Sequence, residues 1–267
     1  MNPRRFYFRM LGTIELVDPT GTPVEPLTAH PKTLALLAFI VLSCRGGPCS
    51  RDTLLAYFWP DLSMKRARHA LRQTLYEIRQ ALGVGVLEVR GRHGVTLSKS
   101  RFGADVLDLL KALDERRVDD VAALFRGELL PGLHVKGAHE FDAWLAGERE
   151  TLVRSVSGTL WRESRRLAQA GDLDAALLRG RQALLHDPYN EGGLRDLMSV
   201  LLKGGRSMEA LRVYRDARDR VRKVGMKLGM ETEALAEQCQ SDHLSGAAQV
   251  QSPVSDGKPA AGVPEGR

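Results

Sequence analysis

The segment MKRARHALRQTLYEIRQAL, residues 64–82, constrains the fold of this chain most, because a helix separates its polar and apolar residues. At about 100° per residue, the apolar positions gather on one side and the cations on the other. The predicted buried face consists of Ala67, Leu71, Thr74, Leu75, Ile78 and Leu82. The predicted outer stripe consists of Lys65, Arg68, His69, Arg72, Tyr76 and Arg79. Such a helix rests on a core and presents a basic surface.

The outer stripe lacks the mixture of charges that is typical of an ordinary exposed helix face. Glu77 is the only acidic residue of the segment, and it lies off the stripe. Like charges one turn apart repel by about 0.2–0.5 kcal/mol per pair, so an external anion would relieve this cost. The planar fork of Arg suits phosphates and guanine edges. The stripe therefore favours DNA binding, with a plain solvated face as the alternative interpretation.

The charge distribution supports a polyanionic partner for the first part of the chain only. Residues 1–100 hold 14 Lys and Arg against 7 Asp and Glu, a difference of +7. The other 167 residues hold 25 and 26, a difference of −1, so the whole excess of +6 lies in the first hundred residues. A basic domain joined to a near-neutral one indicates that the two have different partners.

Residues 1–100 predict a winged helix-turn-helix, because three helices are followed by a basic hairpin. Short strands are expected at FYFRML and TIELVD, with TPVEPL as a possible third. A buried helix is expected over residues 31–44, and a second begins after the N-cap Ser50 and stops at Pro60. The third, 63–82, ends at Gly83. The hairpin consists of VLEV and VTLS around the loop RGRHG, residues 90–94.

The rest of the chain reads as helical from Asp105 to about Leu244 and contains an internal repeat. Residues 160–177 align with residues 194–211 at a shift of 34, the period of tetratricopeptide repeats. The matched positions are Leu160, Leu167, Gly171, Ala176 and Leu177 with Leu194, Leu201, Gly205, Ala210 and Leu211. We therefore expect an α+β domain over 1–100, an all-α tetratricopeptide-like domain over 101–245 and a disordered tail over 246–267.

The sequence offers little support for catalysis, cofactors or metals. His134, His139 and Glu140 do not form a metalloprotease motif, and a polar loop is expected there. Cys44, Cys49 and His69 lack a fourth ligand at a usual spacing, so no metal site is predicted. No apolar run is long enough for a membrane span, and three cysteines make no disulfide framework. We expect a cytoplasmic, non-enzymatic protein without a cofactor.

These segments resemble a known family. Residues 6–100 are similar to the winged-helix output domains of OmpR/PhoB-type response regulators. Residues 6–240 resemble the Streptomyces-type antibiotic regulatory proteins, in which that domain precedes a bacterial transcriptional activator domain. The matching pieces are RMLGTIELVD, HPKTLALLAFIVLS, SRDTLLAYFWPD, ARHALRQTLYEIRQALG, FRGELLPGL, EFDAWLAGERETL and GRSMEALRVYRDARDRV. The chain departs from larger relatives in having neither a receiver domain nor a GxxxxGK[ST] phosphate loop.

The resemblance implies a transcriptional activator that binds promoter repeats as two protomers side by side and recruits RNA polymerase. On this chain, the third helix would enter the major groove of DNA in the nucleoid. Contacts to base edges or to adjacent phosphates are expected from Arg68, His69, Arg72 and Tyr76. Phosphate contacts are expected from Lys65, Arg66, Arg79, Arg90 and Arg92.

The loop of residues 59–62 would contribute to polymerase contact through Trp59 and Asp61. Core packing for Trp59 and helix capping for Asp61 are the alternatives. An alternative for the whole protein is an interaction adaptor, whose repeats bind proteins and whose basic helix docks an acidic partner.

Overall fold

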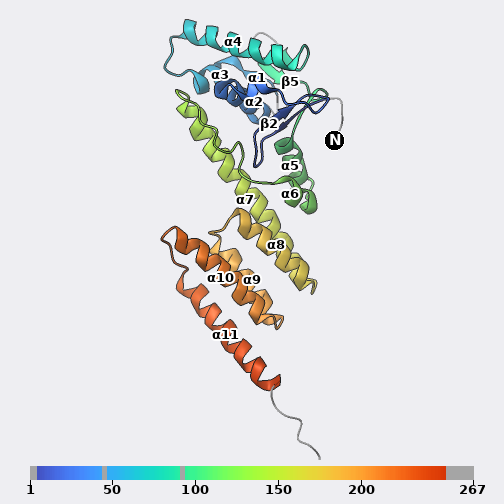
Figure 1. The fold of residues 1–267 in the computed structure, drawn as a ribbon, viewed down its shortest axis with the longest axis vertical. Helices are drawn as coiled ribbons and strands as arrows, with labels where there is room; N and C mark the ends of the chain where they lie inside the picture. Colours follow the sequence, from blue (N-terminus) through green and yellow to red (C-terminus); the bar gives the residue numbers. More distant parts are fainter. Residues whose placement is uncertain (1–4, 44–46, 91–93, 251–267) are drawn as a thin grey trace, which may run out of the picture. The chain divides into compact units, whose positions relative to one another are not determined.

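The computed structural model describes residues 5–43, 47–90 and 94–250, without the side chains of Pro26, Thr28, Arg90 and 245–250. The chain divides into two compact units (Figure 1). Unit 1 comprises residues 1–163 with 185–187, and unit 2 comprises 164–184 with 188–267. The division falls within the long helix α7, His139–Gln169. The domain boundary near residue 100 stays a prediction. Among the described residues, no helix is long and apolar enough to span a bilayer.

The first sheet of unit 1 is organised around strand β1, Phe6–Arg9. It pairs antiparallel with β2, Glu15–Val17, and parallel with β6, Phe102–Ala104. The two predicted strands are therefore confirmed. The sequence pattern missed β6, because three residues are too few to show the alternation of apolar and polar residues that indicates a strand. The prediction of a third strand at TPVEPL was wrong. After one β-bridge between Val17 and Pro23, the chain forms α1, Glu25–Thr28. Proline lacks the N–H that a strand ladder needs, but it fits a first helical turn.

A buried carboxylate joins the end of β1 to the start of α5, Asp105–Asp114. Asp105 accepts backbone hydrogen bonds from Met10 at 2.8 Å and Leu11 at 3.2 Å. Burial raises the pKa of Asp105, and these N–H donors oppose that shift by stabilising the carboxylate. One turn later, the Tyr7 hydroxyl donates to Asp108 at 2.7 Å. These hydrogen bonds to the first sheet thus fix where α5 begins.

The helices between β2 and β6 agree with the sequence pattern. Their bounds are α2 Pro31–Ser43, α3 Arg51–Phe58 and α4 Met64–Leu82. All residues from Thr33 to Leu42 are buried, as the apolar run predicts. Ser50 caps α3 as predicted, because its hydroxyl accepts a hydrogen bond from the Thr53 N–H at 3.0 Å. A second sheet follows, with strand order β3–β5–β4, in which β4 is Leu87–Arg90, β5 is Gly94–Leu97 and β3 is Cys49–Ser50.

The prediction of helix throughout from Asp105 was wrong over residues 125–138. This irregular segment follows α6, Val118–Leu124, and returns to the first sheet. The Gly12 N–H donates to the Glu128 carbonyl at 2.9 Å, and the Leu130 N–H donates to the Met10 carbonyl at 2.7 Å. Backbone pairing with the sheet therefore replaces helical hydrogen bonds here. The two segments approach so closely that a Cβ on Gly12 would lie 2.9 Å from the Arg126 carbonyl oxygen.

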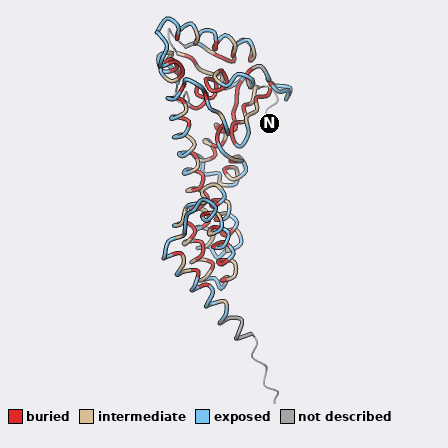
Figure 2. Tube along the Cα trace, turned by 60° about the vertical axis from the view of Figure 1, so that its left-hand side comes forward, coloured by how far each residue is buried: buried red, intermediate tan, exposed pale blue. Residues whose placement is uncertain are grey.

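Unit 2 consists of successive helices joined by short connections. Beyond the end of α7 they are α8 Leu173–His186, α9 Glu191–Lys203, α10 Ser207–Lys223 and α11 Met230–Val250. Buried and exposed turns alternate along them, as expected for stacked helices with one buried face (Figure 2). Helix α11 reaches Val250, five residues into the predicted tail, and the rest of that tail lies outside the described residues.

The 34-residue repeat corresponds to a repeated turn. Gly171 and Gly205 both have positive φ, +84° and +72°. The following residues, Asp172 and Arg206, donate their N–H groups to the carbonyls of Leu167 and Leu201. This is the Schellman arrangement, in which a left-handed glycine ends a helix. The matched leucine, glycine and hydrogen-bond positions show that the sequence repeat is also a structural one.

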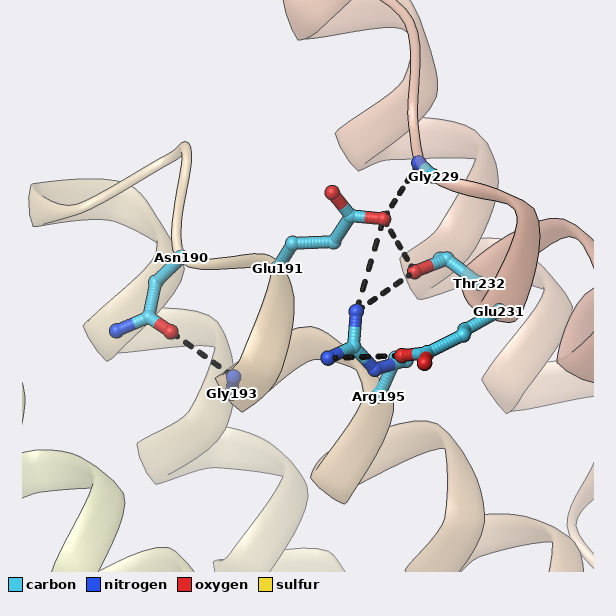
Figure 3. Close-up of polar contacts among 7 residues, drawn as sticks. All are labelled: Asn190, Glu191, Gly193, Arg195, Gly229, Glu231 and Thr232. Carbon is cyan, nitrogen blue, oxygen red and sulfur yellow. Dashed lines mark hydrogen bonds and ion pairs between the residues drawn. The ribbon is translucent and has the colours of Figure 1, made fainter.

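The start of α11 is fixed by one carboxylate of α9 (Figure 3). Glu191 Oε1 accepts hydrogen bonds from the Gly229 N–H at 2.6 Å and from the Thr232 hydroxyl. Arg195 lies 3.8 Å from the same oxygen and pairs with Glu231 at 3.3 Å. The Thr232 hydroxyl, the Gly229 N–H and the Arg195 guanidinium hold the pKa of Glu191 below its usual value. The cluster links the N-terminal ends of α9 and α11.

Replacement of Gly12 by alanine should destabilise the protein more than replacement of Gly21. Both have positive φ, but nothing lies within 4 Å of a Cβ at Gly21. Gly21→Ala should therefore cost only backbone strain, about 1 kcal/mol, whereas Gly12→Ala adds a clash and should cost about 3 kcal/mol. Urea unfolding of both variants measures the difference. Equal losses would contradict the close approach of residues 12 and 126–127.

The Glu191 cluster should stabilise the fold in a pH-dependent way. Because the pKa of Glu191 is lowered in the folded state, its contribution is present above the unfolded pKa and is lost as pH falls through the folded pKa. At neutral pH, Glu191→Gln should lower the free energy of unfolding by about 1 kcal/mol, and this gap should close as the pH falls below the usual titration range of a glutamate side chain. Urea titrations across this range test it. The exposed control Glu237→Gln should show no such gap, and a gap independent of pH would contradict the assignment.

Candidate nucleic-acid interface

Helix α4 has the rotational phase that its sequence predicts. Its buried residues are Ala67, Leu71, Thr74, Leu75, Ile78 and Leu82. Every member of the predicted outer stripe is exposed: Lys65, Arg68, His69, Arg72, Tyr76 and Arg79. Arg66 is also exposed. The division into a packing face and a basic face is therefore confirmed.

Contacts with four elements hold this helix in place within unit 1. It packs against α1, α2, α3 and β4 (Figure 1). The Thr33 hydroxyl of α2 donates to Glu77 at 3.1 Å, so the single acidic residue of α4 serves its packing side. Gly83 ends the helix with φ +78°, and its N–H donates to the Arg79 carbonyl. These contacts fix which side of α4 faces outward.

The basic stripe forms a continuous exposed surface. From Lys65 to Arg79 it runs about 21 Å, at about 1.5 Å per residue. Across residues 5–43, 47–90 and 94–250, no ion pair involves Lys65, Arg66, Arg68, Arg72 or Arg79. The Tyr76 side chain, 56% exposed, lies among these cations. Exposed guanidinium groups beside an aromatic ring can bind a phosphate backbone and base edges.

The hairpin that follows α4 is present, and both of its predicted contact residues lie outside the described side chains. Strands β4 and β5 pair from Leu87–Leu97 to Arg90–Gly94, as predicted. Arg90 ends β4, and its side chain lies outside the described part of the chain, as do Arg92 and His93 entirely. The sequence pattern missed β3, which pairs with β5 through Cys49 and Val95. This pairing attaches the hairpin to the residue that caps α3.

The connection between α3 and α4 contains the two predicted polymerase-contact residues. Trp59 is buried at 8% exposure, with its ring 5.9 Å from that of Phe58. Lys32 lies over the Trp59 ring at 5.6 Å and donates to the Phe58 carbonyl at 3.2 Å. Trp59 therefore packs in the core, the alternative that the sequence left open. Asp61 is exposed in the turn that follows.

The other polar groups that the sequence singled out do not converge on a site. His134 lies beside Asp142 at 2.7 Å in the irregular segment, as the loop prediction implies, and His139 begins α7. Cys49 is buried in β3, and Cys44 is outside the described residues. No group of three metal-ligating side chains occurs in the described ranges.

Comparisons with known proteins found one matching domain family and a solved structure with a similar fold. Residues 108–240 match the family model of the bacterial transcriptional activator domain. Among solved structures, Mycobacterium tuberculosis EmbR in complex with a low-affinity phosphopeptide matches with a TM-score of 0.55 and 21% identity. The match covers 92% of this chain and 70% of EmbR, and it shows a shared fold. No curated protein matches the chain significantly.

The chain thus carries a bacterial transcriptional activator domain over residues 108–240. Both findings agree with the resemblance to the Streptomyces-type antibiotic regulatory proteins.

Proposed function

We propose that this protein is a transcriptional activator that binds duplex DNA sequence-specifically through a winged helix-turn-helix in unit 1. The observation that carries the proposal is the basic stripe on the exposed face of α4, which forms no ion pair with any residue that the structure describes. In this assignment α3 and α4 form the helix-turn-helix, and the β4–β5 hairpin is the wing. The match of residues 108–240 to the bacterial transcriptional activator domain supports the same function.

The stripe suggests two kinds of contact along α4. In helix-turn-helix proteins the N-terminal part of the recognition helix contacts base edges. Arg68, His69, Arg72 and Tyr76 would read bases or contact the adjacent backbone. Lys65, Arg66, Arg79, Arg90 and Arg92 would bind phosphates and set the register on the duplex.

Two protomers side by side on repeated promoter sites remain part of the proposal. The resemblance implies binding to repeated promoter sequences, and each protomer would bring one basic stripe to one DNA repeat. Recruitment of RNA polymerase is proposed for the turn after α3, with exposed Asp61 as the contact. Buried Trp59 would support that turn from beneath instead of touching the polymerase.

Loss of two stripe arginines should weaken DNA binding without affecting the fold. A preferred fragment is first selected from genomic DNA, and its affinity is measured by gel shift at several salt concentrations. Arg68→Ala/Arg72→Ala should lose discrimination against bulk competitor, by about 1–3 kcal/mol for each lost base contact. Lys65→Ala should weaken all duplexes alike and reduce the salt slope by about one.

The exposed cation Lys136, which belongs to the irregular segment 125–138 and not to α4, provides a matched control, and Lys136→Ala should change neither quantity. Thermal unfolding should be unchanged in every variant, because these side chains are exposed. Unchanged affinity and salt slope in Arg68→Ala/Arg72→Ala would refute the assignment. Failure of the native protein to prefer any fragment over bulk DNA would favour the adaptor alternative.

Asp61→Ala should separate polymerase contact from DNA binding. The substitution removes an exposed carboxylate in the turn, so affinity for the selected fragment should stay within about twofold of the native value. Activated transcription from that fragment with purified RNA polymerase should fall several-fold. The exposed Asp114 of α5 gives a control, Asp114→Ala, that should retain activation. Full activation by Asp61→Ala would exclude Asp61 as the contact.

A further inference from the structure

The connection between α10 and α11 exposes three apolar side chains within seven residues. Val224 is 54% exposed, Met226 53% and Met230 89%. Single exposed apolar residues are ordinary on protein surfaces, whereas a local group of them indicates a contact surface. Methionine is flexible and polarizable, which suits it to a surface that adapts to a partner.

Cations accompany these apolar side chains in the sequence. Residues 212–227 contain seven Lys and Arg against two Asp. Arg222, Lys223 and Lys227 are exposed, and no ion pair of the described residues involves them. Cations near a helix C-terminus are favourable for the helix dipole, which accounts for Arg222 and Lys223. The dipole accounts neither for Lys227, which lies four residues beyond α10, nor for the exposed apolar side chains.

Both ends of this connection are fixed by hydrogen bonds. At its start, Gly225 has φ +76°, and the Met226 N–H donates to the Val221 carbonyl at 2.9 Å. At its end, the Glu191 carboxylate binds the Gly229 N–H and the Thr232 hydroxyl (Figure 3). The exposed side chains are therefore presented by a backbone that is already ordered. Preorganisation of this kind lowers the entropic cost of binding.

We propose that this surface binds an acidic, amphipathic segment of a partner protein. We name it the α10–α11 surface, and it consists of Arg222, Lys223, Val224, Met226, Lys227 and Met230. The apolar side chains would cover the apolar face of the segment, and the cations would pair with carboxylates at its edges. An apolar centre with a charged rim is the usual composition of a transient protein interface.

Charge and polarity favour a protein segment over nucleic acid as the occupant. Protein–DNA interfaces are polar and strongly positive, so exposed Met226 and Met230 would gain little from phosphates. The nearby acids of α11 are engaged, since Glu231 pairs with Arg195 and Glu233 accepts from the Tyr214 hydroxyl. The inference is independent of DNA binding by α4.

Fluorescence anisotropy tests the surface on the full chain. The probe is a fluorescein-labelled helical peptide with Leu along one face and Glu along the other. Met226→Ser/Met230→Ser should weaken its binding by about tenfold or more, as expected for residues at the centre of an interface. Lys223→Glu/Lys227→Glu should weaken it several-fold and remove most of its salt dependence.

Matched controls come from the same unit. Leu178→Ser alters an exposed apolar residue of α8, and Lys203→Glu alters an exposed cation at the end of α9; neither should change the affinity. A peptide of the same composition with its apolar face scrambled should bind weakly. Circular dichroism should show the native helix content in each variant.

Several results would overturn the inference. Absence of peptide binding by the native chain, or equal losses in the control variants, would do so. Displacement of the peptide by duplex DNA in an Arg68→Ala/Arg72→Ala background would assign the surface to nucleic acid. A sedimenting dimer that dissociates in Met226→Ser/Met230→Ser would assign it to a second copy of the chain.

Discussion

The pairing of β1 with β6 is the constraint on which unit 1 depends. It joins residues 6–8 to residues 102–104, so the intervening helices and the hairpin are closed into one loop. Parallel strands require a long crossover, and here the crossover contains the whole candidate DNA-binding apparatus. The entropic cost of closing so long a loop must be offset by buried contacts. The apolar α2 and the Asp105 carboxylate, which binds two N–H groups of the β1 end, supply such contacts.

The packing of these elements within unit 1 also decides which face of α4 is exposed. A helix with a split composition can turn either way in isolation, because nothing fixes its rotation. In the folded chain, α1, α2, α3 and β4 bury one face, and the Thr33–Glu77 hydrogen bond uses the only carboxylate of the helix on that side. The cations are then left together on the exposed side without acidic partners. The electrostatic repulsion among them is a cost that an anionic ligand would remove.

Unit 2 shows how one structural device can be used for different purposes. Left-handed glycines end α7, α9 and α10 with the same hydrogen-bond pattern. At Gly171 and Gly205 the chain turns directly into the next helix of the repeat. At Gly225 a longer connection follows, and it is anchored by Glu191 in place of an immediate helix start. That extra length exposes Met226 and its neighbours, which is why the proposed partner surface occurs at this turn.

The sequence by itself determined the local features of this protein: the helix bounds of α2 to α4, the cap at Ser50, the phase of α4 and the 34-residue repeat. These follow from short-range periodicity and from the backbone preferences of serine, proline and glycine, which act within one or two turns. Only the tertiary structure decided β3, β6, the irregular segment 125–138 and the burial of Trp59. Two- and three-residue strands carry no period, and whether a tryptophan faces the core depends on residues such as Lys32 that are distant in sequence. The Glu191 cluster belongs to this second group, because its partners lie 38 and 41 residues away and meet only when α9 packs against α11.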